Sequence, residues 1–127
     1  MLCAMLLTAA ILTIAVSLMH SVLGERRLIG PLLRREDLPV ILGSLKNTRL
    51  TLRIAWHITS LMWWGIAAVL AYMHVAPETA SVAFLWMVSA VFGVSGAVAL
   101  VASRGKHRSW VFFLPIAALT GYAAYTA

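Results

Sequence analysis

The chain has 127 residues, of which 62% are hydrophobic and only 11% are Asp, Glu, Lys or Arg. With a mean hydropathy of +0.93, it is too apolar for a soluble globular domain of this size. The composition therefore indicates a membrane protein. The formal net charge is +6, but the basic residues are not interleaved with aromatic residues as on a nucleic-acid-binding surface, which argues against a nucleic-acid partner.

Four stretches contain no Asp, Glu, Lys or Arg, and each approaches the roughly 20 residues that a helix needs to cross a bilayer. They are residues 1–24, 54–77, 79–103 and 109–127. The sequence therefore predicts an all-α membrane protein with one domain over residues 1–127, an up-down bundle of four transmembrane helices at about 2–23, 48–75, 78–103 and 109–126. The first stretch is interpreted as a helix and not as a signal peptide, because it lacks a basic n-region and a small-residue cleavage site.

Polar residues mark one face of the first predicted helix. Thr13, Ser17, His20 and Gly24 follow one another at spacings of four, three and four residues. They share a face that is expected to pack against protein. Cys3 is the only cysteine, which excludes an intramolecular disulfide and a thiolate metal motif.

A long cytoplasmic loop at residues 25–47 is predicted between the first two helices. It mixes apolar and basic residues. Its stretch LIGPLLRREDLPVILGSL predicts a short helix in the headgroup region that is broken at Pro31 and Pro39.

All ten Lys and Arg residues fall at two of the predicted helix connections, which an even number of spans separates. These connections therefore lie on one side of the membrane, which the positive-inside tendency identifies as the cytoplasm. Both termini and the short turn at residues 75–78 are then predicted to lie outside. The charge favours a bilayer with anionic headgroups as a partner. The first connection carries Arg26, Arg27, Arg34, Arg35, Lys46, Arg49 and Arg53, and the second carries Arg104, Lys106 and Arg108.

The second predicted helix carries a polar and aromatic face. In the stretch LRIAWHITSLMWW, residues 52–64, His57 follows Arg53 by four positions and Trp64 follows His57 by seven, which places all three on one face. Trp63 and Trp64 lie too deep for an interfacial aromatic belt, and a buried indole N–H needs a partner. This face is therefore predicted to look into the bundle.

The last two predicted helices carry proline and small-residue signals. Pro77 and Glu78 suit the first turn of the third helix, and Pro115 is expected to bend the fourth because it removes a backbone hydrogen bond. Small residues recur every four positions on the third helix, which predicts a packing face for a sister helix or, alternatively, for a second copy of the chain. They are Ser89, Gly93 and Ala97.

Glu25 and Arg53 are predicted to form an ion pair at the inner end of the bundle. Glu25 follows the first helix and Arg53 precedes the deep part of the second, so antiparallel packing brings them to one level. The alternative is that the Arg53 guanidinium reaches lipid phosphate while the Glu25 carboxylate reaches water.

Three of the four histidines have similar predicted depths on the cytoplasmic side. If the helices follow chain order around a square, His20 lies between His57 and His107. Glu25 lies near this group, whereas His74 lies at the opposite end. Three imidazoles and a carboxylate suit zinc, copper or iron, and a pair of histidines suits haem b. The alternative is that His20 and His57 only form hydrogen bonds, to Ser17, Ser60 or a neighbouring carbonyl, and that His107 belongs to a solvated basic loop. The sequence has no H-E-x-x-H motif and no cysteine pair.

Three stretches, HSVLGE at residues 20–25, LRIAWHIT at 52–59 and WWG at 63–65, resemble a family of small bacterial four-helix integral membrane proteins. The resemblance covers the first two helices and their loop, and it implies membrane residence without a known activity. The sequence therefore favours a non-enzymatic, structural or accessory protein of the bacterial inner membrane, as a homo-oligomer or within a larger membrane complex. The alternative is a metal- or haem-binding, redox-active protein that uses His20 and His57. No catalytic residue is assigned.

Overall fold

The computed structural model describes residues 2–41 and 43–127, with only the backbone of Leu2. Leu42, within the predicted first loop, lies outside the described residues. Within them the protein is helical and has no β-strand, so the predicted all-α class is confirmed. The elements are α1 (Leu2–Gly24), the π-helical turn η1 (Glu25–Ile29), α2 (Gly30–Leu33), α3 (Leu45–Val75), the 3-10 turn η2 (Pro77–Thr79), α4 (Val82–Ala102) and α5 (Trp110–Thr126).

Three helical segments are long and apolar enough to cross a membrane: Cys3–Leu33, Leu45–Val75 and Val82–Ala102. α5 is also apolar, and its 17 residues fall at the short end of the roughly 17–25 residues of transmembrane helices. Large apolar side chains stay uncovered along these helices, such as Leu61 at 67% exposure and Val94 at 65%. A surface of this kind is unfavourable in water and suits lipid.

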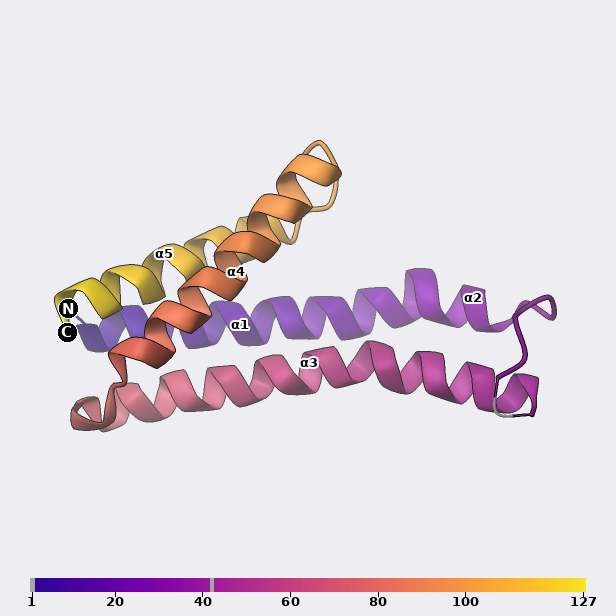
Figure 1. Cartoon of the computed structure of the whole chain (residues 1–127), viewed down its shortest axis with the longest axis horizontal. Helices are drawn as coiled ribbons and strands as arrows, with labels where there is room; N and C mark the ends of the chain where they lie inside the picture. The colour runs from indigo at the N-terminus through magenta and orange to yellow at the C-terminus, as the bar shows by residue number, and fades with distance from the viewer. Residues whose placement is uncertain (1, 42) are drawn as a thin grey trace.

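α1 is the central helix of the molecule. It packs against α3 on one side and against α5 on the other, and α5 packs against α4. Figure 1 shows α1 and α3 side by side along their length, whereas α4 is inclined and leaves α3 after the η2 turn. The two termini lie at the same end as η2. The α2–α3 connection lies at the other end, and the α4–α5 connection lies above the middle of α1 in this view (Figure 1). The expected square of helices is therefore open between α3 and α4.

Two clusters of buried side chains form the core. The cluster near the termini draws on α1, α3, α4 and α5, with Leu6, Leu70, Leu85 and Ala123 among its members. The second cluster is built by α1, α4 and α5, from Val16, Val88, Phe92, Phe113 and Ile116, with Trp63 of α3 packed against it. Beyond Trp63, toward the α2–α3 connection, α3 has α1 as its main neighbour, and the polar residues of the two helices meet there.

The first connection is shorter than predicted, because α1 continues through η1 and α2 to Leu33. The Gly30 N–H donates to the Glu25 carbonyl, which makes the wide turn of a π-helix. This wide turn accommodates Pro31, whose ring clashes with the carbonyl four residues earlier in a regular α-helix. A Cβ on Gly30 would lie 2.8 Å from the Glu25 carbonyl oxygen, so the turn requires glycine. The predicted break at Pro31 is wrong, and the connection to α3 covers residues 34–44.

α4 begins later than predicted. Pro77 and Glu78 belong to η2, and α4 is capped by Ser81, whose Oγ accepts from the Phe84 N–H at 3.3 Å. The extended backbone of Ser81 separates the two elements, and its side chain satisfies a free N–H of the first helical turn. The placement of Pro77 in the first turn of this helix is therefore wrong. Pro115 lies inside α5 as expected.

Small residues bring α4 close to its sister helix α5. Ser89 Oγ donates to the Ala117 carbonyl at 2.8 Å, and a Cβ on Gly93 would lie 3.6 Å from the Ala117 Cβ. Gly96 continues this face, and Ala97 is exposed. Ala97 does not share this contact with α5, because two helical turns take about 7.2 residues, which is nearer to the seven-residue spacing of Gly96 from Ser89 than to the eight-residue spacing of Ala97.

Candidate functional site

Three serines join α1 to α3 at the deep end of a polar site. Ser17 Oγ donates to the Ser60 carbonyl at 3.0 Å, and Ser60 Oγ donates to the Ser17 carbonyl at 3.4 Å. Ser21, one turn further along α1, donates from its Oγ to Ser60 Oγ at 2.8 Å. Ser17 and Ser60 are buried, so these contacts pair polar groups that water does not reach.

His57 extends these contacts toward the end of α1. Its Nδ1 lies 3.0 Å from Ser21 Oγ, and its Nε2 lies 3.1 Å from Glu25 Oε2. Because a carboxylate only accepts hydrogen bonds, Nε2 is the donor in the second contact. The imidazole therefore connects the serines to the charged end of the site.

Glu25 and Arg53, the two residues expected to pair, lie together. Glu25 Oε1 is 2.8 Å from Arg53 Nη2, while Oε2 faces His57. Both carboxylate oxygens are thus engaged by groups on α3. The side chains of Glu25 and Arg53 are 32% and 51% exposed, so this network runs from the buried serines to the surface of the molecule.

His20 is held separately, in a stack with Trp56. The two rings are 4.2 Å apart and nearly parallel, at 9°. His20 Nε2 lies 3.3 Å from the Trp56 carbonyl and donates to it, and Trp56 Nε1 donates to the His20 carbonyl at 3.2 Å. A Cβ on Gly24 would lie 2.5 Å from the Trp56 ring, so glycine one turn after His20 makes the space for the indole.

Trp63, rather than Trp64, faces the core. Its ring meets His20 at 5.1 Å and Phe113 at 5.4 Å, both edge-on. Trp64 is 48% exposed, so the prediction that it looks into the bundle is wrong. One residue step turns a helix by about 100°, which moves Trp64 off the buried face of α3. That face carries Ser60, Ala67, Leu70 and Met73.

The ligand set expected for a metal comprised His20, His57, His107 and Glu25. Among the described residues, no three His, Cys, Asp or Glu side chains form a group that could hold a metal ion. Both imidazole nitrogens of His57 have partners in the chain instead, a serine and a carboxylate, and one nitrogen of His107, Nδ1, is 2.8 Å from Ser109 Oγ. His74, expected apart from this group, has its Nδ1 2.7 Å from the Cys3 carbonyl.

Ser21 is the member of the site that the sequence analysis missed, whereas Ser17 and Ser60 were expected as hydrogen-bond partners of the histidines. A signal for Ser21 exists, because Ser17, Ser21 and Glu25 recur every four residues on α1. On α3, Ser60 follows His57 by three residues. Each stripe lies on one face of its helix, and their contact could be predicted only if the register of the two antiparallel helices were known.

The fold and the site define an all-helical protein whose long segments can cross a membrane and whose two longest helical segments are joined by a polar network. No protein-family model, curated protein or solved structure matches the chain.

Proposed function

We propose that this chain is a small multipass protein of the bacterial inner membrane, of structural or accessory rather than enzymatic character. Its four long helices cross the bilayer, with both termini outside and both basic connections in the cytoplasm. The termini and η2 share one end of the molecule, and both basic connections lie away from that end (Figure 1), which supports this topology. The basic residues would then meet the cytoplasmic headgroups.

The observation that carries the structural role is the engagement of the polar site within the chain. His57 is held between Ser21 and Glu25, and Glu25 is held between His57 and Arg53. Each contact joins α1 or η1 to α3. Between lipid-embedded helices there is little hydrophobic driving force, so side-chain hydrogen bonds and close packing hold the helices together. The site thus acts as a polar clasp between α1 and α3, and we use the name polar clasp for Ser17, Ser21, Glu25, Arg53, His57 and Ser60.

The metal- or haem-binding alternative gains no support from the geometry. A ligating imidazole must direct a free ring nitrogen at the metal, but both nitrogens of His57 face protein atoms. His20 is stacked on Trp56 and its Nε2 faces a backbone carbonyl. An absorption spectrum and metal analysis of the detergent-purified protein test this alternative, and a Soret band or a stoichiometric metal would restore it.

Cysteine labelling tests the proposed topology. In a Cys3→Ala background, Glu78→Cys in η2 and Glu36→Cys in the α2–α3 connection each replace an exposed carboxylate, so the two variants are matched in charge. A membrane-impermeant maleimide added to the periplasm is expected to label position 78 and to leave position 36 unlabelled until the membrane is permeabilised. The reverse pattern contradicts the topology.

A further inference from the structure

A cavity of about 430 Å³ lies where η1 and α2 run beside the first turns of α3. This volume falls in the roughly 300–1,000 Å³ range of small-molecule sites. Leu33 and Gly30 form part of its wall, and the remaining lining residues carry charge. They are Glu25, Arg26, Arg34, Arg49 and Arg53.

The cavity has an excess of positive charge. Four guanidinium groups line it against one carboxylate, and both oxygens of that carboxylate, on Glu25, already face Arg53 and His57. In the part of the chain that the structure describes, the Arg26 and Arg34 side chains have no hydrogen bond or ion pair. Clustered like charges repel one another unless an anion compensates them.

Arg49 supplies a second observation that points to a ligand. Its Nη2 donates to the Arg35 carbonyl at 3.1 Å, which fixes the guanidinium in place. Its Nε is buried and has no hydrogen-bond partner among the described residues. A buried charged donor without an acceptor is unfavourable, and a bound oxyanion beside the guanidinium would satisfy it.

We propose that this cavity binds a phosphate group, supplied either by an anionic phospholipid headgroup or by free phosphate. Planar guanidinium groups match phosphate oxygens in a bidentate manner, and several of them together select phosphate over a single carboxylate. For the lipid source, the inference rests on the proposed membrane topology. α3 has 31 residues and is therefore about 46 Å long, against a hydrocarbon core of about 30 Å. The helix thus extends beyond the hydrocarbon, and the cavity near its first turns lies at the level of cytoplasmic headgroups.

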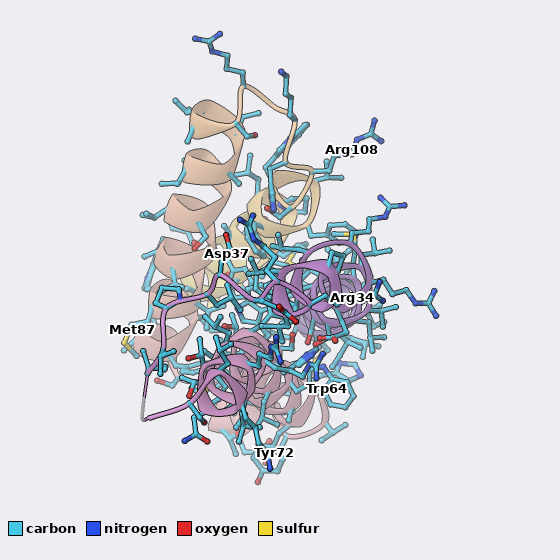
Figure 2. All side chains as sticks on the ribbon, turned by 90° about the vertical axis from the view of Figure 1, so that its right-hand side faces the viewer. Arg34, Asp37, Trp64, Tyr72, Met87 and Arg108 are labelled. Carbon is cyan, nitrogen blue, oxygen red and sulfur yellow. The ribbon has the colours of Figure 1, made fainter. Side chains whose placement is uncertain are left out.

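The second basic connection provides a matched control. Arg104 and Arg108 carry the same charge and belong to the same predicted side of the membrane, but neither lines the cavity. Figure 2, which looks along the molecule from the α2 end, shows Arg108 well apart from Arg34. Arg34 is exposed, so replacing it removes a phosphate contact without removing a contact of the fold.

The experiment measures lipid retention by the full chain in detergent, using native mass spectrometry with equimolar phosphatidylglycerol and phosphatidylcholine. We expect the protein to retain phosphatidylglycerol preferentially. Arg34→Gln should weaken retention about fivefold, and the double variant Arg34→Gln/Arg49→Gln about 30-fold. These values assume about 1 kcal/mol for each basic residue at an anionic surface and a roughly tenfold change in affinity for each 1.4 kcal/mol. Arg108→Gln and the double variant Arg104→Gln/Arg108→Gln should retain the lipid as the unmodified chain does.

A second arm distinguishes the two phosphate sources. Inorganic phosphate is titrated into the chain in phosphatidylcholine nanodiscs, and thermal stability is followed with the same four variants. Stabilisation by phosphate that Arg34→Gln abolishes, without selective lipid retention, assigns the cavity to free phosphate. Equal losses in the cavity variants and the control variants, or no response in either arm, overturn the proposal. Membrane fractionation of the chain in cells is read separately, so a membrane-inserted chain that responds in neither arm refutes the cavity proposal and leaves the proposed membrane residence standing.

Discussion

The α1–α3 pair and the α4–α5 pair solve the same packing problem in different ways. α4 and α5 approach closely through small residues, with Gly93, Gly96 and Gly121 at their contact. α1 and α3 meet through the polar clasp and through the stack of His20 on Trp56. The close α4–α5 contact leaves no space for a site, whereas the α1–α3 contact, made by long polar side chains, leaves a cavity at its charged end.

Replacing Gly24 by alanine should have the largest effect on stability. Its Cβ would fall 2.5 Å from the Trp56 ring, and this ring cannot move without losing its stack and its hydrogen bond with His20. We expect a loss of about 2–3 kcal/mol in the free energy of unfolding, as for strongly overpacked cores. The measurement is a denaturation curve of the purified protein in mixed detergent micelles.

Gly65→Ala is the matched control on α3, since a Cβ there meets nothing within 4 Å. It should leave stability unchanged or raise it by up to about 1 kcal/mol through helix propensity. Equal losses for Gly24→Ala and Gly65→Ala would show that the His20–Trp56 stack does not fix the spacing of α1 and α3.

Gly121→Ala probes the other pair and should cost less, about 1–2 kcal/mol. The added Cβ would lie 2.7 Å from Ser89 Oγ. The serine can rotate away, but it then loses its hydrogen bond to the Ala117 carbonyl. Gly93→Ala is the control, because its Cβ would make an ordinary contact at 3.6 Å. A larger loss for Gly93→Ala than for Gly121→Ala would contradict the described α4–α5 contact.

Glu25→Gln should destabilise the protein more than Glu36→Gln. The difference between the two variants should be smaller than the losses expected for Gly24→Ala and Gly121→Ala. Replacing Glu25 leaves Arg53 and His57 without their anionic partner, and half-exposed charges recover part of this loss through water. Thermal unfolding of both variants at one ionic strength measures the difference. Equal stability of the two variants would remove Glu25 from the polar clasp.

The sequence predicted the helical class, four apolar helices and the proximity of Glu25 and Arg53, because hydropathy and charge spacing can be read from the chain alone. Three of the four helical segments are long and apolar enough to span a membrane. The sequence did not predict the continuation of α1 past Pro31, since a π-helical turn depends on Gly30 and on packing rather than on proline statistics. It also assigned Trp64 to the core face instead of Trp63. That choice depends on how α3 is rotated about its axis, and tertiary packing sets this rotation.

A double-mutant cycle between Ser21→Ala and Ser60→Ala measures whether the polar clasp holds α1 and α3 together, because their hydroxyls meet across the two helices at 2.8 Å. We expect a coupling free energy of about 0.6 kcal/mol, and up to about 1.7 kcal/mol, as measured for hydrogen bonds between membrane helices. Thr8→Ala with Thr59→Ala is the control pair, since each hydroxyl donates to a carbonyl of its own helix, and its coupling should be zero. A coupling of zero between Ser21 and Ser60 as well would contradict the claim that the polar clasp holds the two helices together.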